Sequence, residues 1–194
     1  MSPRWLAAVA ALAIVTGGRV PAAADSFELA VETSVIAPVF RGASLSGRLR
    51  TFSLPHYALG AGISALSLPQ VLVDGSSDNE LKGWHVDLRP SGYVSVDYFV
   101  EPDGTGFAAG IALGVARYTL TSEIVSGRTS YVAVYALPRA AYTWFVTDSL
   151  YLEASVGLQL DAKVSGSTKL STRRFVPFAV LPQANLNVGY LFAR

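Results

Sequence analysis

The sequence predicts an all-β protein, a single closed, antiparallel, up-and-down β-barrel that crosses a membrane with eight strands. Long segments alternate between apolar and small or polar residues, so their side chains point to two unlike environments. Hydrophobic residues make up 51% of the chain and charged residues only 15%. Beyond the N-terminus, however, no apolar run approaches the ~20 residues that a membrane helix needs. An apolar chain without such a helix is either a soluble all-β protein with a large core or a membrane barrel.

The N-terminal segment predicts a signal peptide rather than part of the fold. An arginine at position 4 precedes the apolar run WLAAVAALAIV, and a breaker-rich stretch then leads to Ala22-Ala23-Ala24. Positive, apolar and small-residue regions in this order are typical of a secretory signal, and the run is too short to span a bilayer. We therefore expect residues 1–24 to be removed and residues 25–194 to form the barrel domain.

The C-terminal segment carries the longest alternation. Its larger, mostly apolar set is Val176, Phe178, Val180, Pro182, Ala184, Leu186, Val188, Tyr190 and Phe192, and Gln183, Asn185, Asn187 and Gly189 lie between the later members. This period of two predicts a strand with an apolar outer face that ends in an aromatic pair.

The second face of the other alternating segments distinguishes the two options. In the segment 107–116 the second set is Ala108, Gly110, Ala112, Gly114 and Ala116, and in 150–161 it is Tyr151, Glu153, Ser155, Gly157, Gln159 and Asp161. A soluble barrel would carry a charged outer face, commonly with lysine. Small and polar residues instead suit a narrow lumen, with the apolar set facing lipid. A soluble periplasmic β-protein remains the structural alternative.

The strand count follows from the alternation and the turns. The expected strands are 27–39, 45–54, 57–72, 82–101, 107–120, 130–145, 150–161 and 173–192. The count requires Pro55 to lie in a tight turn and Pro69 near a strand end, because proline cannot donate a ladder hydrogen bond. Short turns at 101–106 and 146–149 alternate with longer connections at 121–129 and 162–172, as periplasmic turns and extracellular loops do. Aromatic residues beside the short turns predict an interfacial girdle: Tyr98, Phe99, Phe107, Tyr142, Trp144, Phe145 and Tyr151.

Charged residues on the inner face predict a lumen network. It comprises Glu28, Glu32, Arg48, Arg50, Asp97, Arg139, Glu153 and Asp161. If the first hairpin centres near Arg41, Glu32 lies opposite Arg50. Charges inside so narrow a barrel should be paired, because an unpaired buried charge is costly. A salt-bridged plug is the favoured interpretation, and a gated or ion-selective lumen is the alternative.

Catalytic, metal and cofactor sites are not expected. His85 alternates with Trp84 and Val86 and is expected to face the lumen, whereas His56 belongs to a turn. Neither lies beside a serine or second acid at a spacing that indicates a general base. The acidic loop 74–80 lacks the ligand spacing of a calcium loop. The chain has no cysteine, which excludes disulfides, a thiol nucleophile and a lipoprotein anchor.

The long connections carry a basic set that could contact the phosphates of lipopolysaccharide, because guanidinium and ammonium groups pair well with phosphate. Its members are Arg41, Arg128, Lys163, Lys169, Arg173 and Arg174. Ordinary solvated surface charge is the equally weighted alternative. Removal of Arg4 and Arg19 with the signal peptide changes the net charge from +1 to −1, which gives no reason to expect a nucleic-acid partner.

Signal peptide, alternation, girdle and terminal aromatic together resemble the small outer-membrane β-barrels of Gram-negative bacteria, a group that includes OmpA-like, OmpX-like and OmpW-like proteins. The resemblance implies an outer-membrane location, contacts with membrane lipid and lipopolysaccharide, and a C-terminal signal, Tyr190 and Phe192, for the barrel-assembly machinery. Two residues follow Phe192, although the family usually ends on the aromatic. The resemblance favours a non-enzymatic structural or surface-interaction role. The alternatives are a small porin-like channel for ions or small apolar molecules and, third, a lipid A-modifying enzyme, although the motifs of barrel deacylases, palmitoyltransferases and omptin-like proteases are absent.

Overall fold

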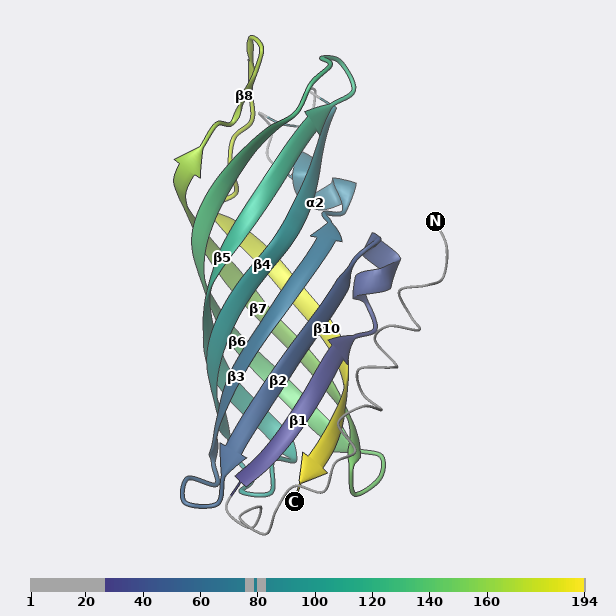
Figure 1. Cartoon of the computed structure of the whole chain (residues 1–194), viewed down its shortest axis with the longest axis vertical. Helices are drawn as coiled ribbons and strands as arrows, with labels where there is room; N and C mark the ends of the chain where they lie inside the picture. Colours follow the sequence, from purple (N-terminus) through teal and green to yellow (C-terminus); the bar gives the residue numbers. More distant parts are fainter. Residues whose placement is uncertain (1–26, 76–78, 80–82, 194) are drawn as a thin grey trace.

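A closed eight-stranded antiparallel barrel forms the body of the protein (Figure 1). The structure is a computed structural model, and it describes residues 27–75, 79 and 83–193. The barrel strands are β1 (Phe27–Ser34), β2 (Ala43–Thr51), β3 (Tyr57–Ser67), β4 (Trp84–Phe99), β5 (Gly106–Ser122), β6 (Thr129–Phe145), β7 (Leu150–Gly166) and β10 (Val180–Ala193). Each strand pairs with its sequence neighbour, and β10 pairs with β1 to close the ring. The predicted fold class is confirmed, whereas the predicted signal peptide lies outside the described residues.

Both chain ends of the barrel lie at the end of the short turns, which we call the turn end (Figure 1). Its turns span residues 52–56, 100–105 and 146–149, and Pro55 lies in the first of them, as the strand count requires. The opposite end, the loop end, carries the longer connections. These hold a short 3₁₀ helix, η2 (Ala37–Phe40), a helix, α2 (Gln70–Asp74), and a hairpin made of β8 (Lys169–Leu170) and β9 (Arg173–Arg174).

Four predicted strand boundaries are wrong at the loop end. The seventh strand ends at Gly166 rather than 161, because it pairs with β6 as far as Tyr131. The first strand ends at Ser34 rather than 39, because residues 37–40 turn into η2. The third ends at Ser67 rather than 72, because Pro69 begins α2 instead. The last begins at Val180 rather than 173, because Arg173 and Arg174 pair with Lys169 and Leu170 in their own hairpin.

Inner and outer faces alternate as the period of two predicts, with one change of phase. In the turn-end half of β4, the buried residues are Ser91, Ser95, Asp97 and Phe99. A bulge between Arg89 and Gly92 then shifts the register, so that Trp84 and Val86 become the buried residues. His85 consequently points outward and lies beside Glu123, and the prediction that it faces the lumen is wrong.

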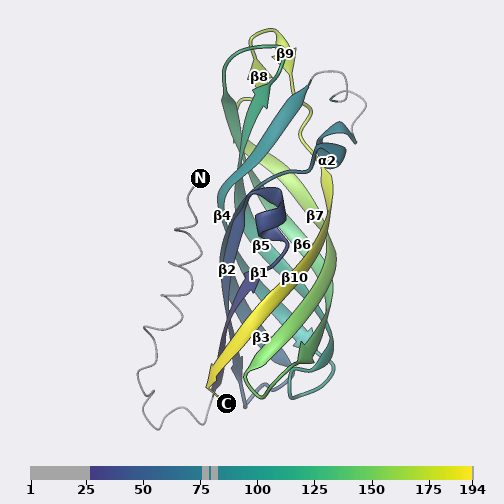
Figure 2. The same cartoon turned by 90° about the vertical axis from the view of Figure 1, so that its right-hand side faces the viewer.

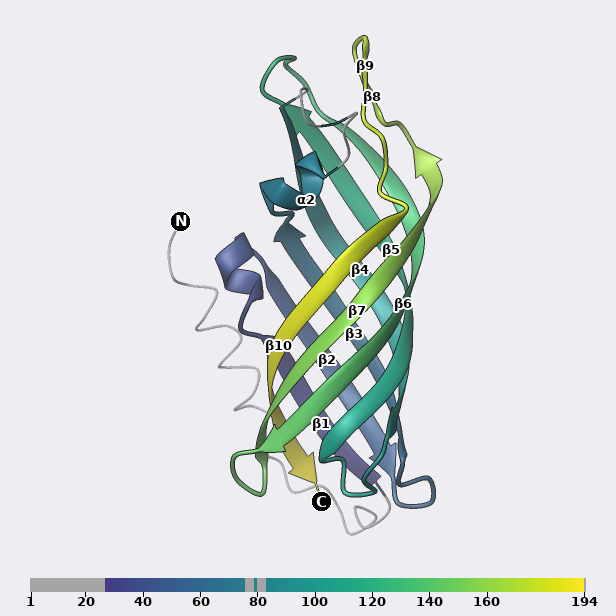
Figure 3. The same cartoon turned by 180° about the vertical axis from the view of Figure 1, so that it is seen from behind.

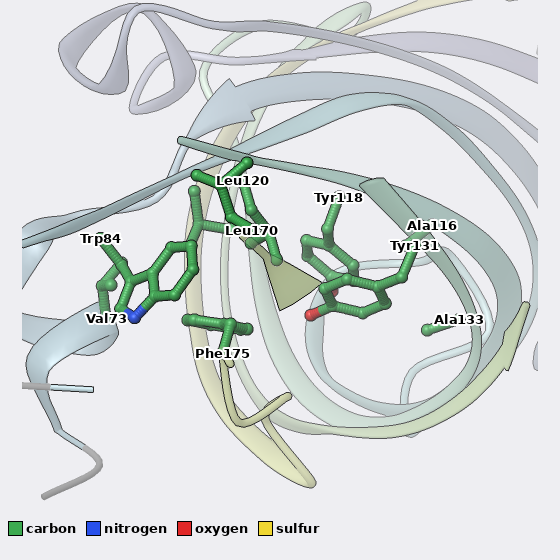
Figure 4. Close-up of a cluster of buried hydrophobic side chains, with 10 residues drawn as sticks. Val73, Trp84, Ala116, Tyr118, Leu120, Tyr131, Ala133, Leu170 and Phe175 are labelled. Atoms are coloured by element: carbon green, nitrogen blue, oxygen red, sulfur yellow. The ribbon is translucent and has the colours of Figure 1, made fainter. Parts of the chain in front are cut away.

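The loop-end parts of β4, β5 and β6 hold a cluster of buried hydrophobic side chains (Figure 4). Phe175 is fully buried there and makes an edge-to-face contact with Trp84, with ring centroids 5.6 Å apart. Tyr118 and Tyr131 stack at 4.9 Å, and Leu170 of β8 covers the cluster. The sequence pattern does not predict this hydrophobic cluster.

Apolar side chains cover the outer surface of the barrel. The exposed set includes Leu29, Leu49, Leu59, Ile63, Val94, Ile111, Leu113, Val156, Leu158 and Val180. Across the turn end, cross-strand aromatic contacts link Tyr57 to Tyr98 and Phe107 to Tyr142. Three residues of the predicted girdle, Phe99, Phe145 and Tyr151, point inward instead. Phe99 and Tyr151 are almost fully buried, and the Phe145 ring packs against Tyr151. No helix among the described residues is long and apolar enough to cross a membrane.

Candidate functional site

Arg48 occupies the middle of the lumen between two carboxylates. Its Nη2 lies 2.9 Å from an oxygen of Glu32 and also forms an ion pair with Glu153 across the barrel. The Arg48 guanidinium additionally lies over the rings of Phe99 and Tyr151, at 5.3 and 5.9 Å from their centroids. Strands β1, β2, β4 and β7 therefore meet through one cation at the centre of the barrel.

The Tyr151 hydroxyl completes this central group by donating a hydrogen bond of 2.5 Å to Glu32. We call Glu32, Arg48, Tyr151 and Glu153 the central layer. Glu32 and Glu153 are 4% and 1% exposed, so the layer fills the cross-section of the lumen rather than lining a water column. Buried charges of this kind are stable only when they are paired.

Arg50 forms a second ion pair nearer the turn end. Its Nε lies 2.6 Å from Oε2 of Glu28, which is directly opposite in the ladder. The same guanidinium donates to the backbone oxygens of Pro102 and Asp103, at 2.9 and 2.8 Å. The turn between β4 and β5 is thus held across the barrel mouth. Gly104, with φ of +79°, leaves the space that the guanidinium needs.

Asp97 of β4 and Arg139 of β6, the two strands that flank β5, form a third ion pair. The carboxylate accepts two hydrogen bonds from the guanidinium, at 3.0 and 2.7 Å. Gly110 lies between them on β5, and a side chain there would overlap Asp97.

Asp161 has no cation among its hydrogen-bond partners. It accepts hydrogen bonds of 2.7 Å from both Tyr118 and Gln159, close to the loop end of the lumen. Seven of the eight predicted network residues therefore form three ion-paired groups, and the eighth, Asp161, accepts hydrogen bonds from uncharged side chains.

The predicted cross-strand partner of Glu32 is wrong. Glu32 lies opposite Ser46, and Arg50 lies opposite Glu28. The reason is the position of the hairpin: η2 and the left-handed residue Arg41, with φ of 54°, place the turn two residues earlier than the assumed centre.

Each of three inner-face tyrosines packs over a glycine of an adjacent strand. A Cβ at Gly62 would lie 2.7 Å from Tyr93, and one at Gly114 would lie 2.5 Å from Tyr135. Gly189 makes the same space for the ring of Tyr151. The small residues on β5 and its neighbours accordingly accommodate aromatic rings and do not by themselves form a pore.

The lumen contains two hollows that are separate from each other. One, of about 30 Å³, lies at the turn end beside Arg50 and Phe145. The other, of about 560 Å³, lies toward the loop end beside Tyr93, Tyr135 and Gln183. They share no lining residue, because the central layer separates them.

The histidines do not form a catalytic arrangement in the described residues. His56 bonds through Nδ1 to the Phe99 carbonyl at 2.9 Å, and the exposed His85 pairs with Glu123. No metal-ligand group of histidine, cysteine and carboxylate residues exists in the part of the chain that the structure describes. Most of the acidic loop 74–80 lies outside the described residues. The Asn79 amide is buried, however, and both its atoms bond to the backbone of Val176.

The predicted basic contact residues lie at the loop end. Arg41 follows η2, Arg128 precedes β6, and Lys163 lies near the end of β7. Lys169 is paired with Arg174 across the β8–β9 hairpin, which also contains Arg173. Sequence reasoning missed Arg89 and Arg117, two exposed arginines that lie opposite each other on β4 and β5. Their alternation with apolar neighbours would have identified them.

The predicted C-terminal aromatic pair lies on the outer face at the turn end. The rings of Tyr190 and Phe192 meet edge to face at 5.0 Å.

Comparison with known proteins gives similarity at the level of structure. No family model matches the chain, and no curated protein matches it. The solved N-terminal β-barrel domain of Pseudomonas aeruginosa OprF is similar at 15% identity and a TM-score of 0.42, over 87% of this chain and 98% of that one. Neisserial surface protein A (NspA) is similar at 11% identity and a TM-score of 0.41, over 87% of this chain and 97% of that one. The assignment of the fold rests on the strand pairing of this chain itself.

Proposed function

We propose that this protein is a non-enzymatic outer-membrane β-barrel whose lumen is sealed and whose role is structural or surface interaction. The observation that carries the proposal is the central layer, in which Arg48 bridges Glu32 and Glu153 across the lumen. A channel needs a water-filled path, whereas here buried side chains separate the two hollows. An eight-stranded barrel is narrow enough for side chains to fill it.

The outer-membrane location is supported by the outer face. Exposed apolar residues surround the barrel, and the turn-end aromatics have the arrangement of an interfacial girdle. The test is an outer-membrane fraction run unboiled and boiled on a detergent gel. We expect a faster unboiled band in that fraction. A band in the soluble periplasmic fraction that boiling does not shift would refute the location.

The sealed lumen is tested by conductance of the refolded protein in a planar lipid bilayer. We expect no current steps from the wild-type protein, and steps from the double variant Arg48→Ser/Tyr151→Ser, which removes the two largest side chains of the central layer. The matched control is Arg117→Ser/Tyr98→Ser, which changes the same residue types on the outer face. Steps from the wild-type protein would show a small ion channel instead.

The basic residues of the loop end support contacts with lipopolysaccharide phosphate. We expect replacement of Arg128, Arg173 and Arg174 by glutamine to weaken lipopolysaccharide binding most at low salt, because screening already weakens it at high salt. Binding that is unchanged at every salt concentration would remove this part of the proposal.

The enzymatic alternative has a separate test. Incubation with lipopolysaccharide, followed by weighing of the lipid A, should leave its mass unchanged. A new lipid A mass that depends on the protein would overturn the non-enzymatic assignment.

For the proposed assembly signal, Tyr190→Ser/Phe192→Ser should lower the amount of folded barrel in the outer membrane, whereas Tyr57→Ser/Tyr98→Ser should lower it less.

A further inference from the structure

The barrel wall is incomplete on one side of β10. Strand β1 pairs with β10 only as far as Ser34, opposite Asn187, and one further bond joins the Val35 amide to the Leu186 carbonyl at 2.9 Å. Strand β10 continues to Val180, but this part pairs only with β7. Figure 3 shows the loop-end half of β10 running alongside β7, with η2 on the other side. From Val180 to Ala184, the edge of β10 that faces away from β7 therefore has no strand partner among the described residues.

Pro182 indicates that this edge is built to remain unpaired. The carbonyl of Ala179 and the amide of Leu191 both bond toward β7, so backbone groups of odd-numbered residues point that way. Even-numbered residues, including Pro182, therefore direct their backbone groups toward the open edge. Proline has no amide hydrogen to leave unsatisfied, which is why it is found on edge strands.

The opposite side of the gap is also well defined. The Ser34 hydroxyl accepts hydrogen bonds from the amides of Ile36 and Ala37, at 3.3 and 3.2 Å, and so ties the start of η2 to the end of β1. The same hydroxyl donates to the side chain of Asn185 at 2.9 Å. Figure 2 shows η2 and α2 on the loop-end side of this region. The gap consequently has a fixed floor at Ser34 and Asn185.

The larger hollow reaches this gap. Most of its 560 Å³ is lined by inward residues, but Pro182 and Ala184, which belong to the outward set of β10, line it as well. A hollow can contact both faces of a strand only where the wall beside that strand is interrupted. Its volume falls within the ~300–1,000 Å³ of typical small-molecule sites.

The lining combines apolar and polar side chains. The floor at Ser34 and Asn185 is polar and includes Asn187, which lies opposite Ser34 in the ladder. Further polar lining comes from Tyr93, Tyr135 and Gln183, and the apolar lining includes Ile36, Phe40, Leu66, Leu72, Leu88 and Leu181. The one cation there, Arg139, is already paired with Asp97. The floor therefore offers hydrogen bonds but no uncompensated charge, which disfavours an ionic head group.

We propose that the hollow binds a single alkyl chain with a small, uncharged hydrogen-bonding head, and that this molecule enters sideways from the surrounding apolar phase through the gap between η2 and β10. The head lies against the polar floor and the chain lies among the leucines. Exposed apolar residues flank the gap on both sides, Val35 and Val39 on one and Val180 on the other, so its mouth faces lipid. This binding site goes beyond the sealed-lumen role and is independent of conductance.

The test is methyl NMR of the leucine-labelled protein in nanodiscs of chain-deuterated phospholipid, with 1-decanol as the probe. We expect saturable nuclear Overhauser contacts from decanol to the methyl groups of Leu88 and Leu181. Ala112→Phe, which fills the hollow from β5, should abolish these contacts. Ala109→Phe, on the outer face of the same strand, is the matched control and should leave them unchanged. Contacts confined to the outward Leu113 and Leu158 would overturn the site.

Two further experiments test the route of entry and the head group of the bound molecule. Ala184→Trp at the gap should reduce the contacts with Leu181, whereas Ala154→Trp on the outer face of β7 should not. Equal contacts in both variants would overturn entry through the gap. Replacing decanol with protonated phospholipid chains tests the uncharged head: contacts from decanol alone support it, whereas contacts from these chains would overturn it, because a phospholipid head carries charge. Contacts from neither would refute the proposal. If Ala112→Phe does not give the heat-shifted band of a folded barrel, Ser91→Leu fills the same hollow from β4.

Discussion

Arg48 shows how a single buried side chain can hold several strands together. It lies on β2, yet its carboxylate partners come from β1 and β7 and its aromatic contacts from β4 and β7. The desolvation of such charges is costly, and mutual attraction offsets it only while every partner remains.

Replacement of Arg48 by alanine is therefore expected to destabilise the barrel. It leaves Glu32 and Glu153 buried without a cation, which costs about 3–5 kcal/mol for a broken buried pair. The free energy of unfolding in urea, measured in lipid vesicles, checks the loss. Arg117→Ala, on the outer face, should change it little, and equal losses for the two variants would contradict the role of the central layer.

Gly189 provides a second residue-scale test. A Cβ at this position would overlap the Tyr151 ring, whereas a Cβ at Gly47 would meet its nearest atom, the Ala30 carbonyl oxygen, at 3.8 Å. We expect Gly189→Ala to cost about 1–3 kcal/mol through overpacking and Gly47→Ala to cost less. Urea unfolding of the two variants checks this, and the reverse order would show that Tyr151 can move aside.

At the scale of elements, the loop end contains structure that the alternation did not predict. Residues 173–179 continue the apolar pattern of β10, but they form β9 and a return segment instead of a strand extension. The reason lies far away in sequence: Asn79 takes both backbone bonds of Val176, and Phe175 is drawn into the cluster with Trp84. The same period-two pattern fits a strand that pairs with another strand and a segment whose backbone bonds to a side chain, so the pattern cannot distinguish the two.

Phe175 is expected to hold the β8–β9 hairpin against the barrel. Removing this fully buried ring costs about 3–5 kcal/mol, and the loss should be local because the cluster involves only β4 to β6 and the loop end. Phe175→Ala should therefore raise hydrogen exchange at Leu170 and Arg173 without affecting β1 to β3. Val176→Ala, at a more exposed position, serves as the control. Faster exchange throughout the barrel would indicate a single cooperative unit instead.

At the scale of the whole molecule, two tryptophans report on the two environments. Trp144 is 47% exposed on the outer face near the turn end, whereas Trp84 is 0% exposed in the loop-end cluster. In bilayers of brominated phospholipid, we expect Trp84→Phe to retain strong fluorescence quenching and Trp144→Phe to lose most of it. Weak quenching in both variants would place the aromatic girdle outside the membrane.

The sequence by itself determined the barrel, the number of its strands and which residues face inward over most of their length. These follow from a period of two and from turn residues, which are local properties. It also identified the lumen charges as a set, because charged residues stand out among small and apolar neighbours.

Only the tertiary structure decided how these residues combine. The position of the first hairpin, set by η2, pairs Arg50 with Glu28 and places Arg48 between Glu32 and Glu153. The bulge in β4 directs His85 outward. The gap beside β10 depends likewise on where β1 stops. Register, bulges and strand ends are fixed by contacts between distant segments, and a shift of one or two residues changes the partner of every side chain without altering the sequence pattern.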